Sequence, residues 1–100
     1  MKRYGSCKIV STLDEAELVA KSIAMGRYCN LIFEASYIKN HFFETLQIYN
    51  RDVSIINCDS KLERFENDIL EAEDLIVFDN INHCKDFDLV KQVKNKVLIC

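Results

Sequence analysis

Residues 74–79 read Asp-Leu-Ile-Val-Phe-Asp, a run of four apolar residues enclosed by two carboxylates. Such a continuous run is typical of a parallel strand that is covered on both faces. Apolar-rich segments also occur before it, over 8–11, 29–33 and 53–56, and after it, over 97–99. Amphipathic stretches separate these segments, and the alternation predicts strand and helix in turn along the chain.

Helix signals fill the first two intervals between the predicted strands. Thr12 and Glu15 form a capping box, in which Thr12 caps free amides and Glu15 reaches back, and this predicts a helix to about Gly26. Apolar residues at helical spacing then predict a helix over 37–49. Asn50 is placed to end that helix in a left-handed cap.

The later intervals also favour helices. Ser60 and Glu63 form a second capping box, which opens a predicted helix through about Ala72, and a shorter helix is predicted over 86–95. Strands separated by helices call for a parallel sheet with right-handed crossovers. The predicted fold is therefore one α/β domain over residues 1–100, three-layered, with a mainly parallel sheet of about five strands. A P-loop-like and a flavodoxin-like strand order both fit this pattern.

The composition is that of a globular domain. Of the 100 residues, 49% are hydrophobic and 29% are charged, with two glycines and no proline. A chain of this size buries about 60–70% of its unfolded surface, which is enough for one modest core. The residues expected in that core are Ile9, Val19, Ile23, Leu31, Ile32, Phe33, Phe42, Leu46, Ile55, Ile56, Phe65, Ile69, Ile76, Val77, Phe78, Val90, Val93, Leu98 and Ile99.

The charge balance opposes nucleic-acid binding as the main activity. The formal net charge is −3 at pH 7, whereas general nucleic-acid binding needs a basic surface. Lys85, Lys91, Lys94 and Lys96 cluster late in the chain, where they predict a solvated helix face. The chain begins without the apolar segment of a secretory signal, and no apolar run nears the ~20 residues of a membrane span. We therefore expect a cytoplasmic protein that does not contact a membrane.

The cysteines indicate reduced thiols rather than a metal site. They lie far apart, with no CxxC pair of the kind that binds zinc or forms a thioredoxin-type motif. Most of them stand in or beside predicted strands, where cysteine acts as a small buried hydrophobe. His83 precedes Cys84, but neighbours in sequence need not meet in space as a catalytic pair. The cysteines are Cys7, Cys29, Cys58, Cys84 and Cys100.

Functional groups of parallel α/β folds collect beyond the carboxyl ends of the strands. A phosphate-binding loop at such a strand end needs glycines, a lysine and a hydroxyl residue. The loop over 34–41 contains no glycine, and Glu34 would place a negative charge near a bound phosphate. Asp79 ends an apolar strand as a magnesium-holding aspartate would, but the next residue, Asn80, cannot act as a general base.

Four segments stand in the order of motifs known from one family. Residues 31–36, Leu-Ile-Phe-Glu-Ala-Ser, look like the Walker A approach LI-x-GES of P-loop ATPases. Residues 54–58 look like the strand FVAINC, residues 74–81 look like the Walker B segment GTLFLDEI, and residues 97–99 fall where a sensor strand belongs. Together they resemble the AAA+ domain of bacterial enhancer-binding transcription activators, over most of the chain.

Neither nucleotide motif is intact. Against GxxxxGK[ST], the first glycine aligns with Glu34, the second with Lys39, the lysine with Asn40 and the hydroxyl residue with His41. The Walker B glutamate aligns with Asn80. The resemblance therefore implies degenerate nucleotide-binding positions without an intact means of hydrolysis. These positions are Glu34, Ser36, Lys39, Asn40, Asp79 and Asn80.

The resemblance implies a non-catalytic, P-loop-like pseudo-ATPase that acts as a regulatory or protein-interaction module. Its expected role is to modulate a larger ATPase or a transcription regulator. The interval between Cys58 and Asp74 is too short for the family's loop that contacts the sigma factor. No catalytic residue, metal or cofactor is expected. The expected partner is a protein, and a homo-oligomer is compatible with this reading.

Three alternatives remain open from the sequence. A receiver-like domain needs an acidic pair after its first strand and an aspartate at the end of its third, but here Ser11-Thr12 and Asn57 stand there, so only a degenerate receiver fits. An inhibitor of a host protein, encoded by a mobile element, fits the small acidic chain. A small enzyme would use Asp79 with His83, or a cysteine at a strand end, but no complete catalytic set can be assembled.

Overall fold

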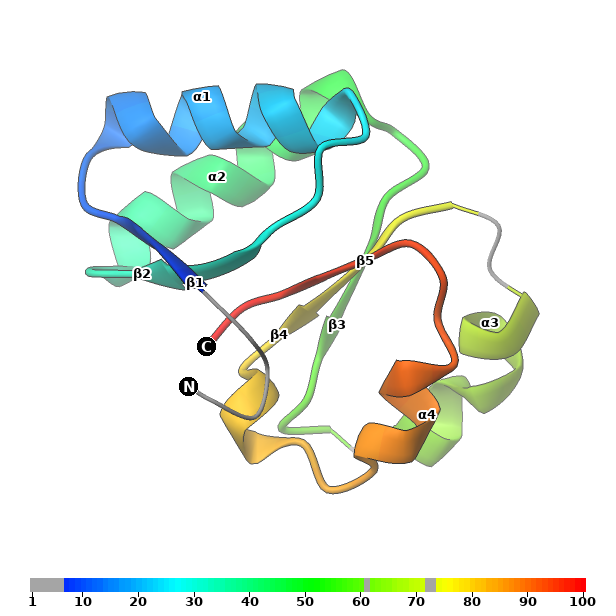
Figure 1. Cartoon of the computed structure of the whole chain (residues 1–100). Helices are drawn as coiled ribbons and strands as arrows, with labels where there is room; N and C mark the ends of the chain where they lie inside the picture. The colour runs from blue at the N-terminus through cyan, green and yellow to red at the C-terminus, as the bar shows by residue number, and fades with distance from the viewer. Residues whose placement is uncertain (1–6, 61, 72–73) are drawn as a thin grey trace.

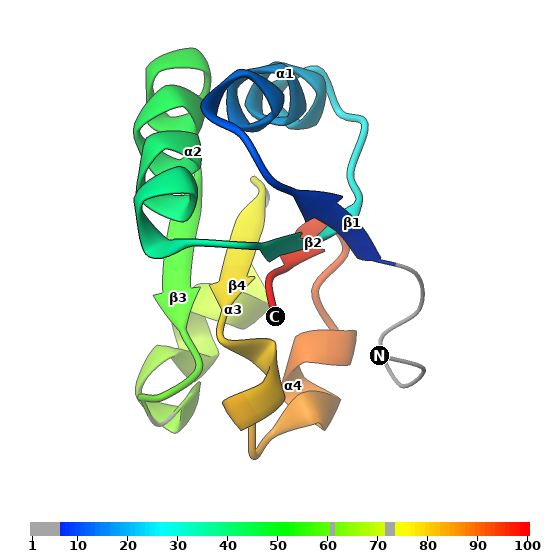
Figure 2. The same cartoon turned by 90° about the vertical axis from the view of Figure 1, so that its left-hand side faces the viewer.

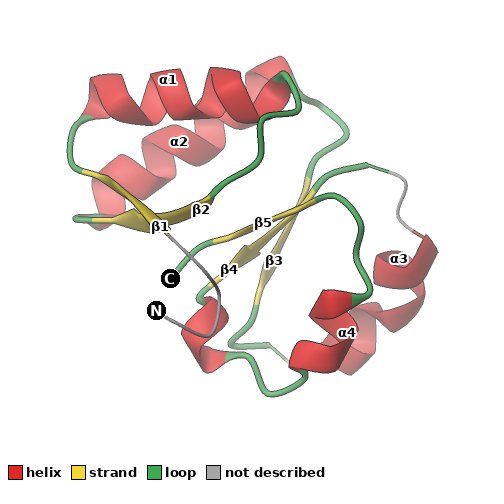
Figure 3. Ribbon diagram, viewed as in Figure 1, coloured by secondary structure: helices red, strands yellow, loops and turns green. Residues whose placement is uncertain are grey.

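The computed structural model describes residues 7–60, 62–71 and 74–100, in which parallel strands alternate with helices (Figures 1 and 3). The strands are β1 (Cys7–Val10), β2 (Asn30–Phe33), β3 (Ser54–Asn57), β4 (Ile76–Asp79) and β5 (Lys96–Leu98). The α-helices are α1 (Leu13–Ala24), α2 (Ser36–Tyr49), α3 (Glu66–Glu71) and α4 (Phe87–Lys91). Two 3₁₀ helices, η2 (Leu62–Phe65) and η3 (Ile81–His83), precede α3 and follow β4. The predicted α/β class with parallel strand pairing is confirmed.

The strands form two sheets rather than one. β1 pairs with β2, and β4 pairs with both β3 and β5. A single isolated bridge, between Leu31 and Ile99, joins β2 to the residue after β5. The prediction of one three-layer sheet of about five strands is therefore wrong.

The break between the sheets has a local cause. The N–H of Leu98 donates to the side-chain oxygen of Asn30 at 3.3 Å, so a side chain takes the place of a main-chain acceptor next to the bridge. Figure 2 also shows β1 and β2 turned away from the direction of β3 and β4, as strong strand twist produces. The strands are only three or four residues long, so few main-chain pairs are available on either side of this turn.

The place where the sheets meet distinguishes the two predicted strand orders. A flavodoxin-like order would place β1 beside β3. In the structure, β2 instead meets the end of β5 through the Leu31–Ile99 bridge. The flavodoxin-like order is therefore wrong for this chain.

Helix α1 begins as its sequence predicts. The Thr12 side chain accepts a hydrogen bond from the N–H of Glu15 at 3.1 Å. Glu15 does not close the predicted box through a main-chain amide, because its carboxylate accepts from the Thr12 hydroxyl at 3.3 Å. The helix ends at Ala24, before the predicted end at Gly26, whose φ of 91° lies outside the helical region.

Of the apolar residues at helical spacing that predicted α2, Ile38, Phe42 and Leu46 are buried, whereas Tyr49 is 53% exposed. The predicted left-handed cap at Asn50 is wrong, because Asn50 is extended, with φ of −137°. Its side chain instead accepts from the N–H of Asp52 at 3.1 Å, which makes a turn toward β3.

The later helices are shorter than predicted. The predicted helix from Ser60 to Ala72 is divided into η2 and α3. Its predicted end, Ala72, lies outside the described residues. The side chain of Glu63 is also not described, so the second capping box lies outside the described part of the chain. The helix predicted over 86–95 is only α4, which Asp86 caps by accepting from the N–H of Leu89 at 3.3 Å. A short α4 leaves a turn before β5.

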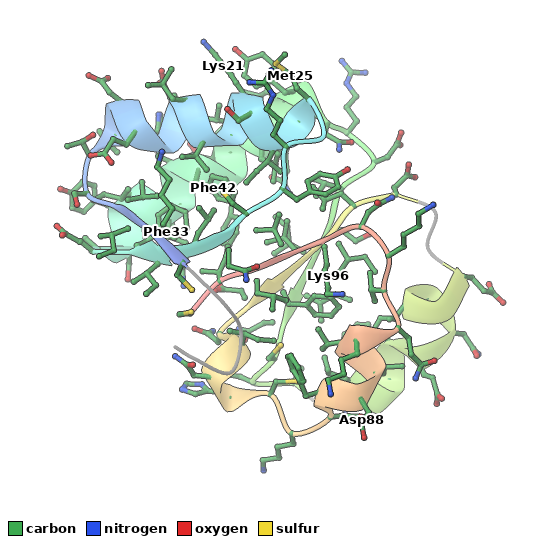
Figure 4. All side chains as sticks on the ribbon, viewed as in Figure 1. Lys21, Met25, Phe33, Phe42, Asp88 and Lys96 are labelled. Atoms are coloured by element: carbon green, nitrogen blue, oxygen red, sulfur yellow. The ribbon has the colours of Figure 1, made fainter. Side chains whose placement is uncertain are left out.

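The core lies on two faces of the three-stranded sheet. Alternation along β4 points Val77 toward a cluster with α1 and α2, while Ile76 and Phe78 face a second cluster with the short helices. In Figure 4, Phe33 and Phe42 meet between β2 and α2, with ring centroids 5.1 Å apart. No helix in the described ranges is long and apolar enough to cross a membrane.

The predicted core needs correction at β1. Ile9 is 56% exposed, whereas its neighbour Val10 is fully buried. β1 pairs only with β2 among the described strands, so it is an edge strand that buries only the side facing the helices. The predicted core residues that are only partly buried are Ile32, Phe33, Ile55 and Phe65.

Candidate functional site

Two of the predicted site residues form an ion pair at the carboxyl end of β4. Asp79 is the last residue of β4 and is 7% exposed. Lys39, in the first turns of α2, places its Nζ 3.2 Å from both carboxylate oxygens of Asp79. Asp79 Oδ1 also accepts from the N–H of Asn80 at 2.8 Å. The pair joins the element that follows β2 to the end of β4, although the two residues are 40 positions apart.

A small hollow lies beside this ion pair, next to the start of α2. Glu34, Ser36 and Lys39 line it together with Cys100, and its volume is about 170 Å³. Ligand pockets for small molecules generally measure about 300–1,000 Å³. Asn40 is exposed on α2 and does not line the hollow. The volume of this hollow lies below that range.

Asn80, at the position of the Walker B glutamate, braces two loops instead of facing the hollow. Its backbone is left-handed, with φ of 56° and ψ of 47°, a conformation that asparagine tolerates better than most residues. Its side-chain amide donates to Asn57 Oδ1 at 3.0 Å and to Asp59 Oδ2 at 3.2 Å. Asn57 Oδ1 also accepts from the N–H of Asp59 at 2.9 Å, which fixes the turn after β3.

A pair that the sequence analysis missed lies at the same edge. Asp59 and His83 are joined through a carboxylate oxygen and the ring Nδ1 of the histidine. They line a hollow of about 420 Å³ with Cys58, Ser60 and Lys85. An aspartate that orients a histidine supplies the base and its orienting group in nucleophilic catalysis. Among the described residues, the hydrogen-bond partner of the His83 ring is Asp59.

The structure gives His83 a different hydrogen-bond partner from the two residues considered in the sequence. His83 bonds to Asp59 and not to Asp79, whose carboxylate is held by Lys39. Cys84 lies beside Cys58, and both thiols are buried. The Asp59–His83 pair could have been expected from one signal: both residues follow closely on the carboxyl ends of strands that turn out to be neighbours.

The thiols differ in their surroundings. Burial and the adjacent Cys84 raise the pKa of Cys58 to about 12. Cys29, predicted to be buried, is exposed, because it precedes β2 instead of lying within it. Cys7 Sγ lies 3.6 Å from Cys100 Sγ. Within the described ranges, no three histidine, cysteine or acidic side chains are arranged to hold a metal ion.

A separate hollow of about 540 Å³ lies at the opposite ends of β3 and β4. Asp52, Asp68, Glu71 and Asp74 give its lining an acidic character. Ser54 and Ile76, the first residues of β3 and β4, also line this acidic hollow. It therefore lies at the amino ends of the strands, whereas the predicted site residues gather at the carboxyl ends. We therefore assign the candidate site to the Lys39–Asp79 pair and its surroundings.

Comparison with known proteins gives no relative from which a function could be transferred. The chain matches no protein-family model, no curated protein and no solved structure.

Proposed function

We propose that this chain is a non-catalytic, P-loop-like module that modulates a larger ATPase or a transcription regulator through protein contact. The ion pair between Lys39 and Asp79 is the observation that carries the proposal. In a working P-loop site, the lysine contacts the nucleotide phosphates and the Walker B aspartate helps to hold Mg²⁺. Here Lys39, one position before the residue that aligns with the P-loop lysine, bonds to the Walker B-like Asp79 at 3.2 Å. The nucleotide and the metal would have to break this contact in order to bind.

The lack of glycine near the start of α2 supports the same proposal. A phosphate loop needs glycine so that main-chain amides can wrap the phosphates. Glu34 and Ser36 stand in this segment instead, and Glu34 adds a negative charge. Asn80 offers an amide that is already bonded to Asn57 and Asp59. Asn80 itself has no carboxylate with which to activate a water molecule.

The arrangement of strands favours the P-loop-like interpretation over the receiver-like one. β2, which leads to the Walker A-like segment, meets the end of β5, and β4, which carries the Walker B-like segment, pairs with β5 on its other side. This places Lys39 and Asp79 on either side of the strand that aligns with the sensor strand. A receiver of flavodoxin-like order would bring β1 beside β3 instead.

Exposed apolar side chains on the outer helices support a role in protein contact. Leu18 and Met25 on α1 and its C-cap are 64% and 73% exposed, and Ile48 on α2 is 75% exposed. Figure 4 shows Met25 and Lys21 at the far end of α1, on the side away from β4. Larger contiguous apolar patches mark surfaces where another protein binds, and these side chains are the candidates for such a patch.

The nucleotide part of the proposal can be tested by thermal unfolding with and without millimolar Mg-ATP. A ligand at about 100 times its dissociation constant would stabilise the fold by roughly 2.7 kcal/mol, or several degrees for a domain of this size. We expect a shift of less than about 1 °C. A clear shift that disappears in Asp79→Ala would contradict the proposal.

The protein-contact part needs its own experiment. Cross-linked complexes would be captured from the native host with the wild-type chain, with Met25→Lys and with the control Lys94→Glu. We expect at least one ATPase or transcription regulator to be captured by the wild type and the control and lost with Met25→Lys. Capture of the same proteins by all three chains would argue against the α1 surface as the contact.

A further inference from the structure

The two sheets are held together along a narrow line of contacts, which we call the sheet seam. It consists of the Leu31–Ile99 bridge, the hydrogen bond from Cys100 N–H to the Leu31 carbonyl at 3.0 Å, and the bond from Leu98 N–H to the Asn30 side chain. The seam carries far fewer main-chain bonds than the sheets on either side of it. A covalent link across the sheet seam would therefore restrain the two sheets at a place where few main-chain hydrogen bonds join them.

Two cysteine side chains meet across this seam. Cys7 lies in β1 opposite Asn30, and Cys100 bonds to Leu31, so the two thiols approach each other from either side of β2. Their sulfur atoms are 3.6 Å apart, although the residues are 93 positions apart in sequence. Both residues are partly exposed. A disulfide bond is about 2.05 Å long, so the sulfurs must approach by roughly 1.5 Å, through rotation of both side chains together with a backbone adjustment at the ends of the chain.

We propose that Cys7 and Cys100 are a site of reversible disulfide formation that fastens the sheet seam. The oxidant would be a low-molecular-weight disulfide such as oxidised glutathione. The thiolate of Cys7 attacks one sulfur of the oxidant and releases one molecule of reduced thiol, which leaves a mixed disulfide on Cys7. The thiolate of Cys100 then attacks the Cys7 sulfur and releases the second thiol. Two protein thiols are oxidised, one small disulfide is reduced to two thiols, and the protein's protons pass to the released thiols.

The other cysteines make the proposal specific to this pair. Cys58 and Cys84 are also adjacent, but both are buried, so a soluble oxidant reaches them poorly. Cys29 is exposed and lies outside both pairs, so it can form only a mixed disulfide or a link between two chains. Burial raises the pKa of Cys100 to about 11, so closure of the bond should become faster as the pH rises.

Formation of the disulfide would also affect the candidate site. Cys100 lines the 170 Å³ hollow together with Lys39 and Glu34. The disulfide would fix the position of Cys100 against β1 and so stiffen one wall of this hollow. The proposal does not depend on the function of the Lys39–Asp79 pair, and its test does not use nucleotide binding.

The test is to incubate the whole chain with oxidised glutathione, map the products by mass spectrometry without reduction, and record thermal unfolding. We expect a monomer that has lost two hydrogen atoms, with Cys7 and Cys100 in one cross-linked peptide. Because the link closes a loop of over 90 residues, the unfolding midpoint should rise by at least ~5 °C and return after reduction. Cys29→Ser should retain both effects, whereas Cys7→Ser and Cys100→Ser should each abolish them.

Several outcomes would overturn the proposal. These are glutathione adducts on Cys7 and Cys100 without a cross-link, cross-linking of Cys58 with Cys84 at an equal rate, or a cross-linked monomer with an unchanged midpoint. The mapping and the midpoint are both measured on the wild-type chain. A failure of either serine variant to fold therefore does not remove the test.

Discussion

Lys39 neutralises a carboxylate that the fold has almost completely removed from water. Asp79 is 7% exposed, and its only other described side-chain contact is the N–H of Asn80. Removal of the cation leaves a buried charge unpaired, which costs more than the pair itself contributes. We predict that Lys39→Ala destabilises the fold by about 2 kcal/mol, less than for a fully buried pair because Lys39 is partly exposed.

The measurement for Lys39→Ala is the free energy of unfolding by urea at pH 7. Lys94→Ala is the matched control, because Lys94 is exposed, and it should change the stability by less than about 0.5 kcal/mol. The double variant Lys39→Met/Asp79→Leu should recover much of the loss, since it removes both charges together. Equal stability of Lys39→Ala and wild type would show that water solvates Asp79 well enough without its partner.

Cys58 makes the free energy of unfolding decrease as the pH rises through the alkaline range. Burial and the adjacent Cys84 raise its pKa in the folded state to about 12, above the ~8.5 of an unfolded cysteine. Above about pH 9 the unfolded chain releases this proton while the folded chain keeps it, so stability falls as the pH rises toward 12. We predict a loss of about 1–2 kcal/mol between pH 8 and pH 10. Denaturation curves of wild type and Cys58→Ala should show a shallower decline in the variant, and parallel declines would contradict the prediction.

At the scale of elements, the inner face of α2 contributes much more to the stability of the fold than its outer face does. Phe42 is fully buried against Phe33 and Phe43, whereas Ile48 on the same helix is 75% exposed. Truncation of a buried phenylalanine loses transfer free energy and leaves a cavity, which together cost about 3–5 kcal/mol. We predict that Phe42→Ala loses that amount and that Ile48→Ala loses less than about 0.5 kcal/mol, both measured by urea denaturation. A large loss in Ile48→Ala would show that Ile48 is covered by another chain.

The order of elements could be predicted from the sequence because each strand is a short apolar segment and each long helix has an apolar stripe. The meeting of Lys39 with Asp79 follows the same logic, since both lie near the carboxyl ends of parallel strands. The Asn50 cap could not be foreseen, because an asparagine side chain can serve a turn as well as a left-handed cap, and here it bonds to Asp52. Ile9 was misassigned because an apolar residue in an edge strand looks like any other strand residue in sequence.

For the whole molecule, the division into two sheets is the feature that the sequence conceals. It depends on a contact between Asn30 and Leu98, which are 68 positions apart, and on how far β2 and β5 overlap. Apolar patterning records which residues are covered, but it does not record which strand lies beside which. The α1 and α2 helices cover parts of both sheets, so a single apolar cluster contains Val10 and Leu31 together with Val77 and Val97. The sheets are thus joined more by side-chain packing than by main-chain bonds.

This division predicts unequal protection from hydrogen exchange. β4 is bonded on both sides, by β3 and by β5, whereas β1 is bonded only to β2 among the described strands. Local opening at the sheet seam would expose the amides of β1 and β2 to solvent while β4 stays folded. The free energy of this opening should be smaller than that of global unfolding, so the amides of β1 and β2 should exchange faster than those of β4. In reduced protein, we predict that β4 amides are protected at least tenfold more than β1 amides, about 1.4 kcal/mol, as measured by native-state exchange with NMR or mass spectrometry. Formation of the Cys7–Cys100 bond should reduce the difference in protection between β4 and β1, because it links β1 covalently to the end of the segment that follows β5. Equal protection of β1 and β4 in the reduced chain would instead mean that the packing of α1 and α2 makes both sheets one cooperative unit.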